Sequence, residues 1–195
     1  MSDSEPCFQP PLVVTLPDWV AHCVRDAPAG VTDEERMRLA IELSRLNVAH
    51  DTGGPFGAAV FEQGRLRPLA VGVNRVEPLA NACAHAELIA LMAAQARIGS
   101  YTLRQPGAPA RELFSSCAPC AMCLGAALWS GVTRIVCGAT RADAQALGFD
   151  EGPVFDASWH YLEARGIEVV HGVLARDARA VLAAYAARGG RIYNA

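Results

Sequence analysis

Two short runs of the sequence contain residue types that could build a catalytic metal site. They are Cys83-Ala84-His85-Ala86-Glu87 and Pro119-Cys120-Ala121-Met122-Cys123. Residues three apart lie on one face of a helix, so Cys120 and Cys123 can direct two thiolates at one ion from a single turn. His85 can supply a third ligand from a second helix, which leaves the fourth tetrahedral position of a zinc ion open to water. An open position indicates catalysis, because zinc lowers the pKa of a bound water to about 7.

Glu87 follows the proposed histidine ligand by two residues, about 200° around a helix. This position keeps its carboxylate close to the ion without making it a ligand, which suits a residue that transfers protons. Two alternatives use other cysteines. Cys117 and Cys120 have the spacing of a thioredoxin-like redox pair, and Cys83 could complete a closed four-thiolate zinc site with Cys117, Cys120 and Cys123. Both alternatives leave Glu87 without a role, so the open site is favoured.

The order H-x-E followed by P-C-x-x-C is the signature of zinc-dependent nucleobase deaminases. On these residues the chain resembles the cytidine/nucleobase deaminase superfamily. From about residue 53 to residue 153 it is similar to the guanine deaminase branch, through the runs Gly53-Gly54-Pro55-Phe56-Gly57, Ser115 to Ala126 and Gly148-Phe149-Asp150-Glu151. The resemblance implies one catalytic Zn2+ per chain, a free nucleobase as substrate and Glu87 as the main proton carrier.

The resemblance also implies roles for residues outside the zinc motif. Glu151 is implied to be a second catalytic acid. The residues implied to bind the base are Phe56, Asn74, Ala86, Trp129 and Tyr193. An aromatic base needs flat apolar walls, and an amide offers a purine edge both a donor and an acceptor, which supports Phe56, Trp129 and Asn74 independently. Core packing for Trp129 and a turn for Asn74 remain alternative interpretations.

The carboxyl-terminal residues carry a further expectation. In guanine deaminases of this type, a terminal segment that ends near a tyrosine can close over the pocket of a partner subunit. The resemblance therefore implies a homodimer, in which a tail of residues 189–195, including Tyr193, closes its own site or is swapped onto the partner's. A frayed tail is the alternative.

The favoured function is hydrolytic deamination of guanine to xanthine and ammonia, or of a related aminopurine or aminotriazine. One position does not distinguish a purine substrate from a pyrimidine substrate. Many purine-type members carry Glu two residues before the first ligand cysteine, and here that residue is Ala118. A cytosine or cytidine-type deaminase therefore stays an alternative, as do a tRNA adenosine deaminase and a non-catalytic zinc-stabilised binding module. The intact Glu87 argues against the last of these.

Composition limits the partners. The 195 residues are 52% hydrophobic and 19% charged, enough for one sizeable core. The net charge of −3 and the absence of a basic run argue against a nucleic acid partner. All 17 basic residues are Arg, so the absence of Lys excludes Schiff-base lysine chemistry. The acidic start of the chain lacks an apolar run, and no stretch approaches the ~18 apolar residues of a membrane helix, so a cytoplasmic protein is expected. Cys23 and Cys137 lie in apolar contexts and are expected to be core thiols.

A lead-in, residues 1–31, is expected to pack on a deaminase domain of residues 32–188. Within the domain, Thr32 and Glu35 form a capping box for a helix over 33–49. Further helices are expected over 18–26, 85–98, 121–129, 142–147, 158–164 and 177–188. Strands are expected over 58–61, 66–73, 111–116, 133–138 and 167–173, where Pro68 marks an edge or a bulge. The order predicts an α/β fold, a cytidine deaminase-like three-layer α/β/α sandwich with a mixed sheet of about five strands.

Overall fold

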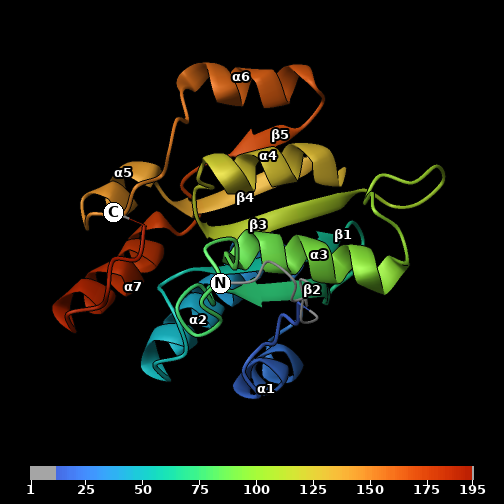
Figure 1. The fold of residues 1–195 in the computed structure, drawn as a ribbon. Helices are drawn as coiled ribbons and strands as arrows, with labels where there is room; N and C mark the ends of the chain where they lie inside the picture. The colour runs from blue at the N-terminus through green and yellow to red at the C-terminus, as the bar shows by residue number, and fades with distance from the viewer. Residues whose placement is uncertain (1–11, 195) are drawn as a thin grey trace, which may run out of the picture.

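A mixed sheet forms the centre of the protein in a computed structural model that describes residues 12–194. Its strands are β1 (Gly57–Glu62), β2 (Pro68–Val73), β3 (Arg111–Cys117), β4 (Arg134–Ala139) and β5 (Glu168–Val170). They lie in the order β2-β1-β3-β4-β5 (Figure 1). β1 is antiparallel to β2 and β3, whereas β3, β4 and β5 are parallel to one another. The predicted mixed sheet of about five strands is therefore confirmed.

Helices alternate with these strands along the chain. They are α1 (Trp19–Asp26), α2 (Asp33–Ala49), α3 (Ala86–Ile98), α4 (Ala121–Ser130), α5 (Arg141–Gln145), α6 (Asp156–Ala164) and α7 (Ala175–Ala187). Their ends differ from the predicted ones by two residues or fewer. The start of α2 shows why the prediction succeeds, because Thr32 accepts a hydrogen bond from the backbone of Glu35 at 3.2 Å while the Glu35 carboxylate accepts one from the backbone of Thr32 at 2.9 Å.

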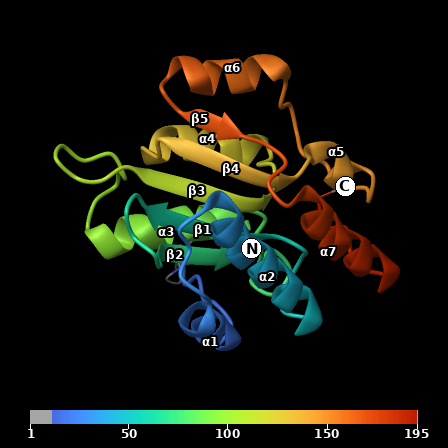
Figure 2. The ribbon, with the colours of Figure 1, turned by 180° about the vertical axis from the view of Figure 1, so that it is seen from behind.

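Helices cover both faces of the sheet, so the fold is a three-layer α/β/α sandwich, as predicted. Strand β1 shows the division, since successive side chains of a strand point to opposite faces. Ala59 and Phe61 belong to a core shared with α2 and α7, and Ala58 and Val60 belong to a core shared with α3. Figure 1 shows α3 and α4 in front of the sheet, and Figure 2 shows α2 and α7 on the other side.

The two ends of the sheet depart from regular pairing. β2 is an edge strand, and its pairing with β1 is irregular beside Pro68, so this residue marks both an edge and a bulge. β5 is shorter than the expected strand over 167–173. Gly172 has a φ of +78°, a left-handed conformation that ends the extended strand, although the backbone N–H of Val173 still donates to Cys137.

The described part of the lead-in packs only partly on the body. Leu16 contacts the core, whereas Leu12 is 81% exposed and Val13 is exposed as well. Trp19 donates a hydrogen bond to Thr52 at 3.2 Å. The domain boundaries at residues 32 and 188 stay predictions. Among the described residues, every helix is too short or too polar to cross a lipid bilayer.

One end of the sheet gathers the segments that hold the predicted site. Gly57 at the start of β1 pairs with Val73 at the end of β2, and Cys117 at the end of β3 pairs with Ala139 at the end of β4. Helix α4 begins shortly after β3, and α3 begins after the loop that follows β2. Ligand sites in α/β proteins lie at the carboxyl ends of parallel strands, which agrees with this arrangement.

Candidate active site and metal centre

The three predicted metal ligands converge at the starts of two helices. His85 immediately precedes α3, Cys120 immediately precedes α4, and Cys123 lies in the first turn of α4. Both cysteine sulfurs lie 3.5 Å from Nδ1 of His85, and the three ligand atoms lie within 4.8 Å of one another. In a tetrahedral zinc site with usual bond lengths, sulfur and nitrogen ligands are about 3.6 Å apart. The donor set and its spacing therefore fit zinc.

The cysteine pair is prepared to bind a cation. The pKa of Cys120 is lowered to about 4, because a hydrogen bond from the Cys123 thiol and contact with His85 together outweigh the opposing effect of burial. A thiolate is the form that ligates zinc. The helix dipole at the start of α4 also favours negative charge at this position. Together these effects provide a soft anionic ligand before any metal arrives.

Glu87 lies in the first turn of α3, beside the metal ligands but outside their cluster. Its side chain is buried, and Oε1 accepts a hydrogen bond from Oγ of Ser115 at 3.2 Å. Burial raises the pKa of the carboxyl, and the negative charge of Cys120 adds to the increase. A carboxyl with a raised pKa beside a metal centre is equipped to accept and return a proton.

Glu151 borders the same cavity from the loop between α5 and α6. Its backbone carbonyl accepts a hydrogen bond from the backbone of Ala121 at 2.9 Å, which fixes this loop against the start of α4. Burial raises the pKa of its side chain to about 8, with further contributions from the negative charges of Cys120 and Glu87. The site therefore contains two buried carboxyl groups, one from helix α3 and one from the loop between α5 and α6.

Phe56 forms part of the cavity wall. It lines the cavity together with His85, Glu87 and Glu151. Its ring meets that of Phe149 edge to face, with ring centroids 5.1 Å apart. This packing fixes the aromatic wall beside the metal ligands.

Asn74 is almost completely buried where β2 ends, next to Phe56. Its backbone N–H donates to the carbonyl of Phe56 at 3.0 Å. Its side-chain oxygen accepts hydrogen bonds from the backbone N–H groups of Gly54 at 3.4 Å and Val76 at 3.2 Å, whereas Nδ2 is buried without a partner. A buried donor without a partner is costly, which marks this amide as a candidate for ligand contact rather than a simple turn residue.

The carboxyl-terminal segment closes the cavity in its own chain. Tyr193 and Asn194 line it together with His85 and Cys120, and the remaining free volume is only about 10 Å3. The Tyr193 ring packs on Phe149 with centroids 5.1 Å apart, and burial raises the pKa of its hydroxyl well above the usual value. Asn194 is tied to Asp150 by two hydrogen bonds, one to each backbone group. The described tail is therefore docked.

Two residues predicted to bind the base are placed differently. Trp129 is 80% exposed and borders a separate surface pocket near Tyr161, which corrects its prediction as a wall of the cavity within its own chain. Nine residues separate it from Cys120, or two and a half helical turns, so it lies on the opposite side of α4 about 14 Å further along. Ala86 is fully buried and its side chain joins the core.

The alternative cysteine sites are not assembled. Cys83 is exposed and lies outside the metal cluster. Cys117 is buried and lines the cavity, but its thiol donates to the carbonyl of Thr140 at 3.4 Å, and burial raises its pKa well above the usual value. Cys137 is a buried core thiol as predicted, whereas Cys23 is only partly buried. The open site of two thiolates and one imidazole is the arrangement that the structure contains.

Sequence reasoning missed one residue that lines the cavity and one that contacts a residue lining it. Ser115 is the buried hydroxyl that contacts Glu87, and Asn194 contributes a side-chain oxygen that is buried without a partner. Ser115 could have been found from strand alternation, because β3 directs it to the face on which α3 packs. Asn194 gave no signal, since its place depends on how the tail folds back over a distant loop.

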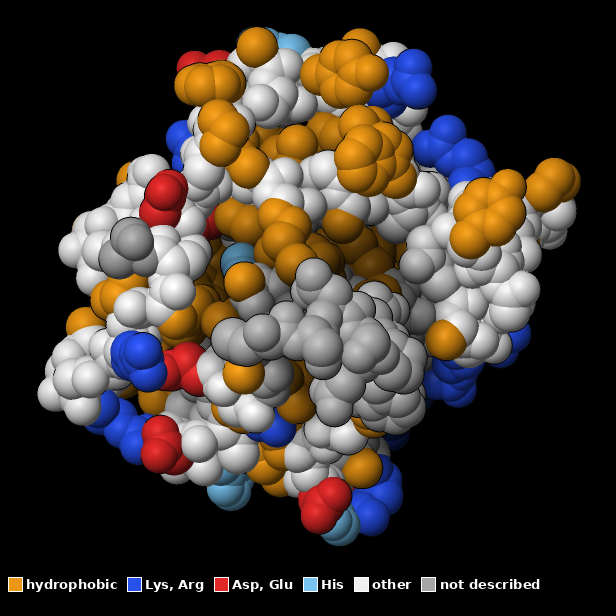
Figure 3. Space-filling model, viewed as in Figure 1, with side chains coloured by type: hydrophobic (Ala, Val, Ile, Leu, Met, Phe, Trp, Pro, Cys, Tyr) orange, Lys and Arg blue, Asp and Glu red, His pale blue; other side chains and the backbone are white. Residues whose placement is uncertain are grey.

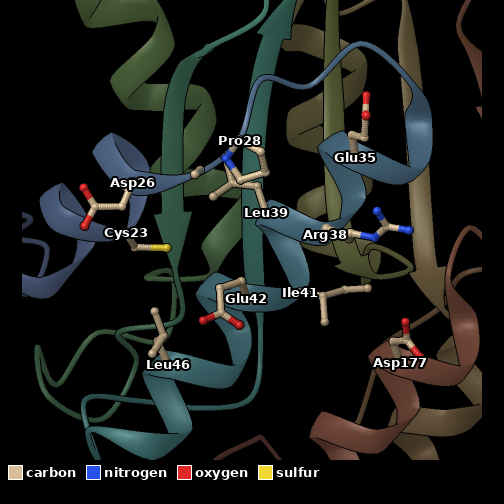
Figure 4. A pocket seen from close by; sticks show the side chains of 11 residues that line it. Cys23, Asp26, Pro28, Glu35, Arg38, Leu39, Ile41, Glu42, Leu46 and Asp177 are labelled. Carbon is tan, nitrogen blue, oxygen red and sulfur yellow. The ribbon is translucent and has the colours of Figure 1, made fainter.

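A larger pocket lies away from this site. It has a volume of about 490 Å3 and is formed by α1, α2 and α7 (Figure 4). Its acidic side chains already have partners, because Glu35 caps α2 and Glu42 pairs with Arg45 at 2.6 Å. None of the predicted site residues lines it. The chemistry is therefore concentrated at the small cavity beside His85.

Comparison with known proteins agrees with this geometry. Residues 31–139 match the family described as the cytidine and deoxycytidylate deaminase zinc-binding region. A solved structure of guanine deaminase from Nitrosomonas europaea is 43% identical, covers 93% of this chain and 100% of its own, and has a TM-score of 0.86. Other similar structures are complexes with 2,6-diaminopurine, at 45% identity, and with 8-azaguanine, at 44% identity.

Two curated relatives show the breadth of the similarity. The guanine deaminase of Bacillus subtilis is 34% identical over 63% of this chain and 74% of its own length. The tRNA-specific adenosine deaminase of Haemophilus influenzae is 34% identical over 74% of this chain and 78% of its own length. The family match spans more than half of the residues and contains the whole metal cluster. The chain therefore belongs to the cytidine and deoxycytidylate deaminase family and is a zinc-dependent hydrolytic deaminase.

Proposed function

We propose that the protein removes the exocyclic amino group of a free aminopurine, with guanine as the favoured substrate and xanthine and ammonia as products. Related aminopurines and aminotriazines belong to the same proposal. The observation that carries it is the cluster of His85, Cys120 and Cys123 beside two buried carboxyl groups, in a small cavity with an aromatic wall. This combination supports hydrolysis of a flat, uncharged base.

The similar proteins support a purine base. The Nitrosomonas europaea and Bacillus subtilis relatives are guanine deaminases, and the ligands of other similar structures, 2,6-diaminopurine and 8-azaguanine, have the shape of a purine. Two of those complexes contain variants of an asparagine and of a glutamate, and these two positions are separated by the same number of residues as Asn74 and Glu151. This agreement supports both residues as parts of the site.

Five residues share the proposed chemistry, three as zinc ligands and two as proton carriers. A zinc ion held by His85, Cys120 and Cys123 would supply the Lewis acidity that activates a water for attack on the carbon that bears the amino group. Glu87 takes a proton from that water and delivers it to a ring nitrogen of the base. Glu151 then supplies or positions the proton that the departing ammonia requires. Its raised pKa, about 8, supports a role as an acid near neutral pH.

The other residues hold the base. Phe56 stacks on the ring, Asn74 donates a hydrogen bond to its edge, and the backbone of Ala86 contacts it at the start of α3. Tyr193 closes the cavity and excludes water, which strengthens the electrostatic effects inside. The support is that Phe56 and Tyr193 line the cavity and that Nδ2 of Asn74 has no protein partner.

Deamination of adenosine in tRNA is the second candidate, because the Haemophilus influenzae relative has that activity. Two observations argue against it. The net charge is −3, whereas proteins that bind RNA usually present a basic face. The cavity is also closed by Tyr193 and Asn194, and a nucleotide attached to an RNA strand would have to displace them. A cytosine or cytidine substrate is the third candidate, supported by the small residue Ala118 in the motif.

Release of ammonia from a panel of substrates tests the proposal. The panel contains guanine, ammeline, adenine, cytosine, cytidine and a tRNA anticodon stem, each incubated with zinc-loaded protein. We expect the highest kcat/KM for guanine and no turnover of the tRNA stem. A preference for cytosine, cytidine or the tRNA stem would overturn the choice of substrate. Absence of turnover on every substrate would leave the non-catalytic binding module as the better interpretation.

We also propose that the protein is a homodimer. Two exposed aromatic residues support an interface, because Trp129 and Tyr161 border one surface pocket between α4 and α6. Figure 3 shows hydrophobic side chains gathered over the region that these helices occupy in Figure 1. Light scattering should give the mass of two chains for the native protein and of one chain for Trp129→Glu. A native monomer at micromolar concentration would contradict the dimer.

In the described structure the tail lines the cavity of its own chain, and exchange of the tail between the subunits of the dimer is the alternative arrangement. Mixing Glu87→Gln chains, which keep the tail, with chains that lack residues 189–195 provides a test. If the tail crosses to the partner, the truncated subunit regains turnover in the mixed dimer. If the tail closes its own site, mixing restores nothing.

The proposed location is the cytoplasm, and the proposed process is purine breakdown. The support is that the six described cysteines are all free thiols, as is usual where thiols are kept reduced. Fractionation of cells that produce the tagged protein would test the location.

A further inference from the structure

Asn47 lies in the last part of α2 and is fully buried, although it contacts neither the cavity nor the metal ligands. Its Nδ2 donates two hydrogen bonds, one to the carbonyl of Gly54 and one to the carbonyl of Asn74, both at 2.8 Å. Its oxygen accepts a hydrogen bond from Oγ1 of Thr52 at 2.8 Å. One side chain thereby joins the loop before β1 to the residue after β2. Such a fully bonded amide in an apolar interior is stiff.

The loop and Asn74 fit together tightly at this point. A Cβ atom placed on Gly53 would lie 2.0 Å from the carbonyl oxygen of Asn74 and 2.8 Å from Nδ2 of Asn47. Gly53 has a φ of +153°, so this position requires glycine both for space and for backbone shape. The backbone of the loop therefore has a single close-packed position against Asn74.

This packing decides which end of the Asn74 amide is free. Its oxygen faces two N–H donors, those of Gly54 and Val76, and only an oxygen can satisfy donors. A flipped amide would place NH2 against N–H. The amino end, Nδ2, is therefore the end of the amide that remains available to a ligand, and it is buried without a protein partner. As long as the N–H of Gly54 stays in place, Asn74 can offer a ligand a donor but no acceptor.

We propose that Asn47 is a positioning residue for base recognition. By bonding to both Gly54 and Asn74 it keeps the N–H of Gly54 beside the Asn74 side-chain oxygen, so that the Asn74 amide presents its NH2 group to a ligand. The proposal rests on the function proposed above. It adds the class of base that is selected, namely one with a hydrogen-bond acceptor at the edge that Asn74 meets. A base that carries an amino group or a C–H there leaves the donor unsatisfied, and a site built for a hydrogen bond rejects such an analogue strongly.

Three bases test the selection. Guanine has acceptors at its carbonyl oxygen and at N7. The analogue 2,6-diaminopurine replaces the carbonyl with an amino group, and 7-deazaguanine replaces N7 with C–H. We expect the native enzyme to have a kcat/KM, or an affinity measured by calorimetry, at least about 10-fold lower for the analogue that lacks the acceptor read by Asn74. Equal treatment of all three bases would overturn the proposal.

The variant Asn47→Ala should relax this selection. Without the two bonds from Asn47 the loop can move and the N–H of Gly54 no longer holds the Asn74 oxygen, so that only the N–H of Val76 opposes a flip of the amide. The discrimination between bases should therefore shrink by at least about 5-fold, and KM for guanine should rise more than kcat falls. A purely structural role would lower activity on all bases equally and leave their ratio unchanged. Asn47→Asp, which keeps the acceptor for Thr52 but loses both donors, serves the same test if the alanine variant does not fold.

Ser44→Ala is the matched control. Ser44 is also buried on α2 and donates to the carbonyl of Pro55 at 2.8 Å, so it anchors the same loop without touching Asn74. Its loss should lower Tm by an amount comparable to Asn47→Ala and leave the ratio between bases unchanged. If Ser44→Ala shifts the ratio as much as Asn47→Ala, general loosening of the loop is the cause and the proposal fails.

A double variant tests whether Asn47 acts through Asn74. In an Asn74→Ala background, Asn47→Ala should change the ratio between bases no further, because the amide that it positions is absent. An additional change would show that Asn47 acts by another route. The two proposals also fail differently. A native enzyme that is inactive on guanine contradicts the proposed function. An active enzyme whose kcat/KM ratios between the bases are the same with and without Asn47 contradicts only the positioning role.

Discussion

The two carboxyl groups of the site are held in different ways. Glu87 lies in a helix and receives a hydrogen bond from Ser115, so its side chain has a fixed orientation beside the metal ligands. Glu151 lies in a loop that is fixed through its backbone contact with Ala121. The difference suits a division of labour, in which a rigid Glu87 handles the attacking water and a loop residue handles the product.

The two glutamine variants should therefore separate the roles. Glu87→Gln should reduce kcat by about 10²–10⁴-fold, because it removes proton transfer, and should retain about one zinc per chain. Glu151→Gln should lower kcat more than it weakens binding of 8-azaguanine. Steady-state kinetics, metal analysis and calorimetry measure these quantities. If Glu151→Gln leaves kcat untouched, Glu151 is not a second acid.

Cys117 separates the metal sites that the motif allows. Because its thiol bonds to Thr140 and lies outside the cluster, Cys117→Ser should bind as much zinc as the native protein. Cys120→Ser should lose most of its zinc in the same measurement. Loss of zinc from Cys117→Ser would instead favour a closed four-thiolate site. Mass spectrometry under native conditions gives the metal count of each variant.

Among the helices and strands, α2 is tied to the sheet by a buried ion pair. Arg36 of α2 and Glu112 of β3 are 2.8 Å apart, and both side chains are about nine-tenths buried. Arg36 also lies over the ring of Phe61, at 5.0 Å from its centroid. The pair fixes the helix that carries Asn47 and Ser44, so it contributes to the placement of the loop at the active site.

Removal of one partner should be costly. Arg36→Met leaves Glu112 buried with only Arg134 near it, at 3.9 Å, and should reduce the free energy of unfolding by about 3 kcal/mol. Arg38→Met, two residues along the same helix, removes an exposed pair with Glu34 and should change the free energy of unfolding by less than about 1 kcal/mol. Urea unfolding compares the two. Equal losses would show that burial of the Arg36 pair carries no special weight.

At the scale of the whole molecule, the active site combines segments from both halves of the chain. The loop before β1, the two metal-binding helix starts and the final residues all border one cavity. The tail is held there by Asp150 and by the ring of Phe149, which are both far from it in sequence. Closure of the site therefore depends on the folded chain as a whole.

Removal of residues 189–195 should open the cavity. We expect KM to rise about 10-fold or more and kcat to fall, because water enters and the wall formed by Tyr193 is lost. Arg191→Ala is the control, since it removes a surface pair with Glu77 at 3.2 Å and keeps the backbone carbonyl that accepts a hydrogen bond from the Tyr185 hydroxyl. Its kinetics should stay within about 2-fold of the native values. A truncated protein with native kcat and KM would show that residues 189–195 are not needed to close the cavity.

Local patterns in the sequence explain what could be predicted. The spacing of Cys120 and Cys123 on one helical turn, the motif around His85 and the capping box at Thr32 each act over a few residues, so the metal ligands and the start of α2 follow from sequence alone. Trp129 was misplaced because a family motif does not reveal which side of α4 faces the cavity. Asn47 was missed because its partners lie up to 27 positions away.

The connection between α3 and β3 lies far from the catalytic end of the sheet. Figure 1 shows this loop projecting beyond the start of β3, and the seven residues of β3 place it about 20 Å from Cys117. A side chain at Gly107 would meet no neighbouring atom within 4 Å. The loop is therefore a suitable place to insert an affinity tag or a fluorescent reporter, so that the enzyme could be immobilised or followed without altering either terminus.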